Sequence, residues 1–227
     1  LSHVKNKVFP FIQSLDFKEG FKLDLKDSNF EINSPILLQE AVQTIEELKI
    51  SDQNYDTQGD IYEYVVSKLE TSGLNGGFRT PRHIIKMMIA MIDPDVNQKI
   101  CDPACGTGGF LVNSYLHILK KYNNKESNDA NRALGDKLSD KQREFLLNEQ
   151  LYGFDYDRSM MQFSQMNMIL HGFKRPNVQY QNSVGKQFNQ DEEYDIILAN
   201  PPFAGNLNKS EINEDIDVKT TKTELLF

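Results

Sequence analysis

The sequence predicts an open α/β fold with a parallel sheet, preceded by a helical segment. Short apolar runs typical of strands occur at residues 99–102, 151–155, 178–180 and 196–198, and patterns typical of helices separate them. A polar or glycine-rich loop follows each of these runs. Because ligands of open α/β sheets bind at the carboxyl ends of the strands, we expect the functional site at those loops.

The composition is that of a soluble globular protein. The 227 residues are 39% hydrophobic and 26% charged, and no apolar stretch has the length of a membrane span or of a secretory signal. Cys101 and Cys105 are too few and too close for a disulfide framework, and the four histidines are scattered. We therefore expect a cytoplasmic protein with no metal site and no membrane partner.

The net charge limits how the protein could use nucleic acid. A formal charge of -8 argues against a chain that binds nucleic acid without help, because such domains are usually basic. If the protein acts on DNA, another component must supply much of the affinity for phosphate.

The first part of the chain reads as helical. Helices are expected at about residues 36–49, after Ser34 and Pro35, and at residues 60–70, with a flexible connector at residues 72–77. We expect residues 1–58 to be the tail of an N-terminal helical domain and residues 59–227 to form the α/β domain.

A helix start is predicted at Thr80 and Pro81. Thr at the N-cap and Pro at the first helical position are a strong signal, and apolar residues at helical spacing give the helix a buried stripe. The free N–H groups of such a start can hold an anion such as a carboxylate. A capped core helix with no ligand would give the same pattern.

A glycine-rich turn follows the first predicted strand. Residues 102–110 read D-P-A-C-G-T-G-G-F and continue into a helical pattern, an arrangement that lets backbone N–H groups approach a ligand. The turn is no Walker loop, since Gly-Lys-Ser/Thr is missing. It also departs from the dinucleotide fingerprint, because Leu111 stands at the third glycine position. Asp102 would repel a pyrophosphate and would suit a cationic ligand. A tight structural turn is the alternative.

The second and third predicted strands also end in polar residues. Asp155 ends the second strand, where an acid can accept hydrogen bonds from both ribose hydroxyls of a nucleoside. Asp157 is the expected N-cap of the next helix, residues 160–171, which leaves Asp155 available. Asn182 follows the third strand. Residues 121–150 are expected to be a solvated insertion with a helix at about 140–148.

The stretch Y-D-I-I-L-A-N-P-P-F at residues 194–203 is the centre of the predicted site. Its apolar run predicts a strand buried on both faces that stops at Asn200. Pro201 and Pro202 provide no N–H, so the carbonyls of Asn200 and Pro201 stay free to face a ligand, and Phe203 adds a flat apolar ring. The alternative is a strand that ends in a proline turn with a core Phe.

Four motifs, in this order, resemble those of amino-group DNA methyltransferases, in particular the modification subunit of type I restriction-modification systems. They are G-F-R-T-P-R at 77–82, D-P-A-C-G-T-G-G-F at 102–110, M-N-M-I-L-H-G at 166–172 and L-A-N-P-P-F at 198–203. The resemblance covers about residues 59–227. It implies a Rossmann-like class I methyltransferase sheet.

The resemblance also implies roles for single residues. Asn200, Pro201, Pro202 and Phe203 would be catalytic, with Asn200 and the Pro201 carbonyl accepting hydrogen bonds from the N6 amine of a target adenine and Phe203 stacking on the base. Asp155 would bind the ribose and Asn182 would lie beside the adenine of S-adenosylmethionine. The methionine half of this cofactor would contact Gly77, Phe78, Arg79, Thr80, Pro81, Arg82, Asp102, Pro103, Ala104, Cys105, Gly106, Thr107, Gly108 and Gly109.

Two departures from the family pattern shape the expected function. The sequence accounts for four of the family's seven strands, so the sheet is truncated after the fourth, and no segment resembles a DNA-recognition domain. The resemblance implies DNA, a specificity subunit, a restriction endonuclease subunit and a second modification subunit as partners. A protein glutamine-N5 methyltransferase, or a non-catalytic fragment, is the alternative.

Overall fold

The computed structural model describes residues 1–14, 29–50, 53, 55–71, 80–124, 135–190, 193–203 and 205–227. The expected connector at 72–77, and with it Gly77, Phe78 and Arg79, lies outside these ranges. In the described ranges, no helix combines the length and the apolar character that crossing a bilayer requires.

A four-stranded parallel sheet forms the centre of the fold. Its strands are β1 (Ile100–Asp102), β2 (Leu151–Asp155), β3 (Asn177–Tyr180) and β4 (Ile196–Ile197), in the order β3-β2-β1-β4. Ile100 stands opposite Leu151 on one side and Ile196 on the other. Since all pairs are parallel, the four carboxyl ends share one edge of the sheet. The predicted α/β architecture is confirmed.

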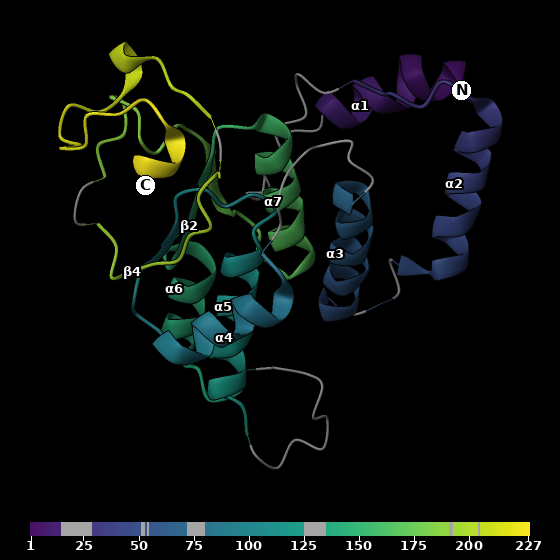
Figure 1. The fold of residues 1–227 in the computed structure, drawn as a ribbon. Coiled ribbons are helices and arrows are strands. Elements are labelled where there is room, and N and C mark those ends of the chain that lie inside the picture. The colour runs from purple at the N-terminus through teal and green to yellow at the C-terminus, as the bar shows by residue number, and fades with distance from the viewer. Residues whose placement is uncertain are drawn as a thin grey trace.

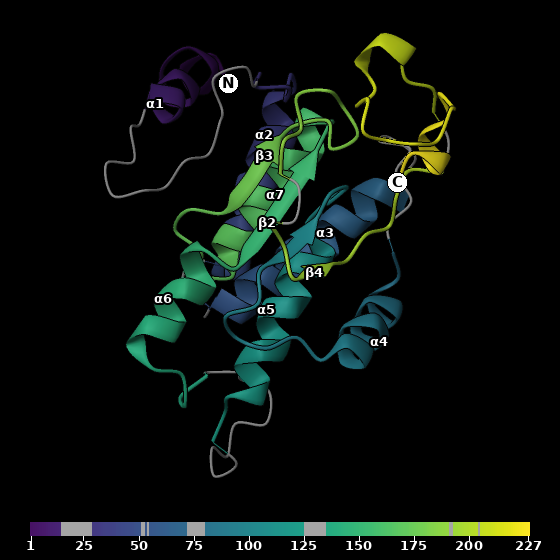
Figure 2. The same ribbon diagram turned by 90° about the vertical axis from the view of Figure 1, so that its left-hand side faces the viewer.

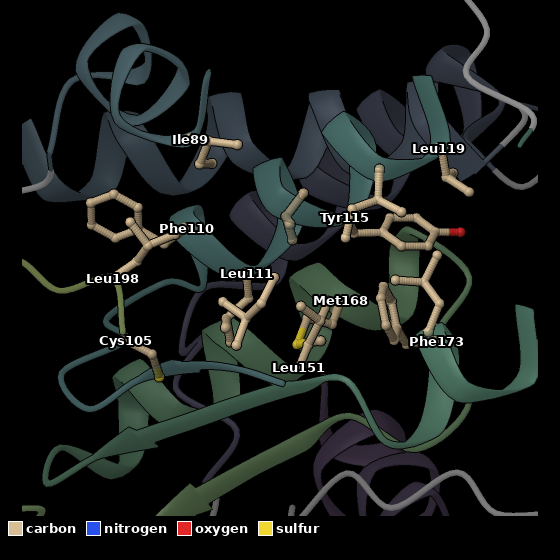
Figure 3. Close-up of a cluster of buried hydrophobic side chains, with 14 of the residues drawn as sticks. Ile89, Cys105, Phe110, Leu111, Tyr115, Leu119, Leu151, Met168, Phe173 and Leu198 are labelled. Carbon is tan, nitrogen blue, oxygen red and sulfur yellow. The ribbon is translucent and has the colours of Figure 1, made fainter. Parts of the chain in front are cut away.

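Helix α4 (Arg82–Ile92) precedes β1, and α5 (Gly109–Lys121) follows it. Helix α6 (Asp140–Asn148) precedes β2, and α7 (Arg158–Leu170) connects β2 to β3. Helix α5 contacts β1 and β2, α7 contacts β2 and β3, and α4 packs on α5 (Figure 2). Side chains from these elements form one apolar core, in which Leu111, Leu151 and Met168 are almost fully buried (Figure 3).

The N-terminal part is helical, as the sequence predicts. It contains a π-helical turn η1 (Val4–Val8), α1 (Phe9–Ser14), α2 (Pro35–Leu48) and α3 (Tyr55–Thr71). Figure 1 shows α3 between α7 and α2, and α3 contacts α7. The expected domain border between residues 58 and 59 falls inside α3 and remains a prediction.

The predicted start of α4 is wrong by one residue. Pro81, with φ -55° and ψ 136°, is still extended and forms the N-cap, and the helix begins at Arg82. The Pro81 carbonyl accepts hydrogen bonds from the N–H groups of Ile84 and Ile85. Thr80, the expected N-cap, therefore lies one residue before the cap.

Burial differs from the prediction in two places. Strand β4 is not buried on both faces: Ile197 is 63% exposed, while the next residue, Leu198, is buried. Since β4 pairs with β1 alone, it is an edge strand of the described sheet. The 121–150 insertion is not uniformly solvated, because Leu146 and Gln150 are fully buried and Gln150 donates to the Asp95 carbonyl.

Candidate active site

A pocket of about 600 Å³ lies at the edge where the four strands end. The loops after β1, β2, β3 and β4 all contribute to its walls, so the tertiary structure brings together residues that are far apart in sequence. The predicted site residues that line it are Thr80, Asp102, Pro103, Ala104, Cys105, Gly106, Thr107, Gly109, Asp155, Asn182, Asn200, Pro201, Pro202 and Phe203.

The glycine-rich loop after β1 is held against the end of β2. The Cys105 N–H donates to the Phe154 carbonyl at 2.9 Å, and the Gly106 N–H donates to Asp155 Oδ2 at 2.8 Å. Gly106 has φ +52°, and a Cβ atom at this position would have no protein atom within 4 Å. Glycine here permits the left-handed backbone and leaves that part of the pocket open.

Two carboxyl groups at the pocket, Asp102 and Asp155, form no ion pair with any side chain in the part of the chain that the structure describes. The pKa of Asp102 is raised to about 8, chiefly because burial disfavours its charge; the Ala104 N–H opposes this rise, and the charge of Asp155 contributes to it. Burial also raises the pKa of Asp155, against hydrogen bonds from the backbone of Asp157 and Gly106. A cation placed in the pocket would favour the ionised form of both acids.

The thiol of Cys105 is unsuited to nucleophilic attack. Its pKa lies well above the ordinary value, chiefly because the group is buried, and the ionised forms of Asp102 and Asp155 nearby raise it further. A thiolate is the reactive form of cysteine, so this thiol stays protonated and inert.

Asp155 is available in the way the sequence predicts. Asp157 caps α7 by accepting from the N–H groups of Ser159 and Met160. Asp155 accepts from Gly106 and, through Oδ1, from the Asp157 N–H at 2.8 Å. An ionised carboxylate has about four acceptor positions, so its two oxygens can still accept hydrogen bonds from a ligand.

The loop after β3 closes another wall. Asn182 lines the pocket, and its Oδ1 accepts from the Val184 N–H at 3.2 Å. The Ser183 hydroxyl donates to the Pro103 carbonyl at 2.6 Å, which ties this loop to the glycine-rich loop. This hydrogen bond therefore fixes the loop after β3 to the loop after β1.

Tyr156 is a pocket residue that the sequence analysis missed. Its ring stacks on Tyr180 with centroids 5.4 Å apart and an interplanar angle of 11°, and it is 59% exposed. The guanidinium of Arg158 lies 4.8 Å from the centre of the Tyr180 ring. The position directly after Asp155 at a strand end was the signal that could have identified Tyr156.

The Asn-Pro-Pro-Phe segment forms the wall beyond β4. Asn200 and Pro201 are half-buried, whereas the Phe203 ring is 63% exposed. The Leu198 N–H donates to the Cys101 carbonyl, so pairing with β1 holds the chain up to two residues before Asn200. The amide and the two prolines consequently leave the sheet at the pocket.

The C-terminal segment, residues 205–227, adds walls that the sequence analysis did not identify. It returns to the loop after β3 through a bridge between Gly185 and Ile212, and a small apolar cluster of Val184, Ile212 and Leu226 holds it there. Figure 1 shows this segment in yellow. Its residues at the pocket are Leu207, Thr223 and Phe227. The segment is mostly irregular, so no periodic pattern could have revealed it.

Some predicted cofactor residues lie elsewhere. Pro81, Arg82 and Gly108 are not among the described residues that line the pocket. Arg82 instead donates to Asp60 Oδ1 at 2.6 Å, and its Nε lies 3.7 Å from Glu63 Oε2, so its side chain joins α4 to α3. Among the described side chains, no group of three or more His, Cys, Asp or Glu is arranged to hold a metal ion.

Comparisons with known proteins agree with this geometry. Residues 53–224 match the N-6 DNA Methylase family. The methylase subunit of the type I restriction enzyme EcoEI from Escherichia coli is 29% identical over 238 residues, which cover 100% of this chain and 46% of that protein.

Two solved structures share the fold. A protein from Vibrio vulnificus YJ016, described as a type I restriction enzyme's modification subunit, is 26% identical with a TM-score of 0.72, over 97% of this chain and 45% of that one. A chain from a type I restriction-modification system is 26% identical with a TM-score of 0.75, over 100% and 45%. The present chain thus spans about half the length of these relatives. Because the family match covers most of its residues and all four strands, the chain belongs to the N-6 DNA methylase family.

Proposed function

We propose that the protein transfers a methyl group from S-adenosylmethionine to the N6 amine of adenine in DNA, as the modification subunit of a type I restriction-modification complex. One observation carries this proposal. Asn200, Pro201, Pro202 and Phe203 line the same pocket as the glycine-rich loop and Asp155, in a chain that belongs to the N-6 DNA methylase family.

The pocket suits this cofactor. Asp102 and Asp155 favour a cationic ligand, and S-adenosylmethionine has a sulfonium and an ammonium group. Gly106 leaves space where a side chain would intrude, and Asp155 retains acceptor positions for ribose hydroxyls. Asn182 and Tyr156 both line this pocket and would flank the adenine ring. When bound, the cofactor would supply the sulfonium methyl group.

The residues after β4 suit the other reactant. The amine of adenine is a weak nucleophile because its lone pair is delocalised into the ring. The Asn200 side-chain oxygen and the Pro201 carbonyl would accept hydrogen bonds from its two N–H groups. These hydrogen bonds favour the pyramidal nitrogen, whose lone pair can attack the methyl group. The exposed face of Phe203 would stack on a base taken out of the duplex.

The charge of the chain supports a role within a complex. At a net charge of -8, the protein would depend on partners for most contacts with phosphates. We propose a specificity subunit that reads DNA, a second modification subunit and a restriction endonuclease subunit as these partners. The proposed location is the cytoplasm, because the proposed substrate is chromosomal DNA.

The test is methyl transfer by the full-length protein together with its specificity subunit. Labelled methyl groups should appear on adenine N6 of duplex DNA, and Asn200→Ala should reduce the rate by at least about a hundredfold while cofactor affinity changes little. Asn208→Ala, an exposed asparagine eight positions later, is the control and should keep the wild-type rate. Labelling of a protein glutamine with none on DNA would overturn the proposal.

A further inference from the structure

Helix α7 carries an unusual set of buried polar side chains. Ser164, Gln165 and Asn167 are all buried, among apolar neighbours such as Met161 and Met168. Figure 3 shows Met168 within the apolar core, next to Leu151. Polar groups in such surroundings are costly unless they make hydrogen bonds. Each of these side chains therefore calls for a specific structural reason.

Asn167 reaches the glycine-rich loop. Its Nδ2 donates to the Thr107 carbonyl at 2.9 Å, across a separation of 60 residues, and the side chain is only 1% exposed. No group among the described residues pairs with its buried Oδ1. The hydrogen bond to the Thr107 carbonyl is therefore the only one that this side chain makes among the described residues.

The hydrogen bond from Asn167 holds the carbonyl of the peptide group between Thr107 and Gly108, and a bond within the loop holds the N–H of the same group. The Thr107 carbonyl accepts from Asn167, and the N–H of the same peptide group, on Gly108, donates to the Cys105 carbonyl at 2.8 Å. With both polar atoms of this peptide group held, its orientation is determined. The neighbouring residues Cys105, Gly106 and Thr107 line the pocket.

Close packing reinforces the contact. Gly108 has φ +79°, and a Cβ atom at this position would lie 2.5 Å from Ser164 Oγ. The loop and α7 therefore touch at a point where only glycine fits. Ser164 and Asn167, three residues apart, lie on one face of the helix and contact the loop together.

We propose that Asn167 is a positioning residue that holds the glycine-rich loop in the conformation that binds cofactor. The inference rests on the proposed function for the identity of that cofactor. It also gives a role to the M-N-M-I-L-H-G segment, whose residues do not line the pocket in the described part of the chain. Asn167 acts through the Thr107 carbonyl and touches no ligand itself.

Gln165 provides a matched control on the same helix. It is also a buried amide, its Nε2 donates to a backbone carbonyl at 2.9 Å, and its Oε1 has no partner among the described residues. Its acceptor is Val178 in β3 and not the loop. Asn167→Leu and Gln165→Met each remove an amide at nearly constant volume, so the cost to the core should be similar.

The experiment compares these variants of the full-length protein in thermal unfolding, in calorimetric titration with S-adenosylhomocysteine, and in hydrogen exchange without ligand. We expect similar losses of Tm. Asn167→Leu should weaken binding by about tenfold or more, and Gln165→Met by less than about twofold. The amides of residues 106–109 should exchange faster in Asn167→Leu alone.

Equal effects of the two substitutions on binding and on loop exchange would overturn the inference, because Asn167 would then serve only the core. If the wild-type protein bound no S-adenosylhomocysteine, the proposed function would fail. Hydrogen exchange would still decide whether Asn167 holds the loop, since this measurement needs no ligand.

Discussion

At the scale of single residues, the site contains two acids, of which Asp102 is buried and Asp155 is half-buried. Asp102 is 2% exposed, and Asp155 shares its pocket. Both carboxyl groups have raised pKa values, chiefly because burial disfavours their charge. Such groups are costly for folding and are well suited to a positively charged ligand.

Asp155→Ala tests the ribose contact. The substitution removes the acceptor positions for ribose hydroxyls and also the bond to the Gly106 N–H. Hydrogen bonds to a charged group suggest a loss of cofactor affinity of about 10- to 100-fold, measured by calorimetric titration. Asp157→Asn, which keeps a cap for α7, is the control and should bind normally. Unchanged binding by Asp155→Ala would remove it from the site.

Asp102→Asn tests the effect of the raised pKa on stability. Since the folded pKa is about 8 and the ordinary value is 3.8, the folded state binds more protons than the unfolded state between these values. The contribution of Asp102 to stability therefore falls as pH rises through this window. Without cofactor, the wild-type Tm should fall more than that of Asp102→Asn between about pH 6 and about pH 8.5.

Thermal unfolding at both pH values measures this difference directly. An equal fall of Tm in the two proteins would show that Asp102 is not protonated in the ligand-free site. Adding cofactor should reduce the pH dependence of the wild-type protein, because a nearby cation favours the ionised carboxylate.

At the scale of elements, the contact between α3 and α7 depends on one glycine. A Cβ atom at Gly59 would lie 2.1 Å from Cε1 of His171, so the helix can approach the ring only without a side chain. His171 is 3% exposed, and its Nδ1 donates to the Asn167 carbonyl at 2.8 Å. The ring is therefore fixed from the side of α7 and has little freedom to give way.

Gly59→Ala should separate α3 from α7. Overpacking of a close contact costs about 1–3 kcal/mol, which exceeds the gain in helix propensity from Gly to Ala of about 1 kcal/mol. We expect a lower Tm and faster hydrogen exchange in α3. Val65→Ala, at an exposed position of the same helix, is the control and should change both little. A higher Tm for Gly59→Ala than for the wild-type protein would contradict the close contact between Gly59 and His171.

At the scale of the whole molecule, the two outer strands of the described sheet, β3 and β4, each have one neighbour, and β4 has an exposed apolar side chain. Strand β4 has a single neighbour, β1, and Ile197 on it is 63% exposed. An exposed apolar edge strand favours pairing with another chain. Since the relatives are about twice as long, further chain could cover this edge in a longer protein.

A protein limited to residues 1–227 should self-associate through this edge. Ile197→Lys places a charge on the strand and should reduce association, as measured by sedimentation velocity over a range of concentrations. Met91→Lys is the control, because Met91 is also apolar and 78% exposed but lies on α4. Equal effects of the two substitutions would show that general surface polarity, and not the β4 edge, controls association.

The sequence by itself determined the order and type of the main elements and the positions of the loops that line the pocket. Strand β2 and helix α6 occupy the predicted ranges, and the residues at all four strand ends reach one pocket. These features are local, because an apolar run and a glycine-rich turn are each decided by residues that are neighbours in the chain.

Only the tertiary structure decided which of these residues meet. It directs Arg82 to Asp60 and Glu63, exposes Ile197, and brings Asn167 to a loop 60 residues away. It also adds Thr223 and Phe227 to the pocket from a segment without periodicity. Such contacts depend on how elements that are distant in sequence pack against one another. The pattern within one stretch of sequence does not specify which other stretch will contact it.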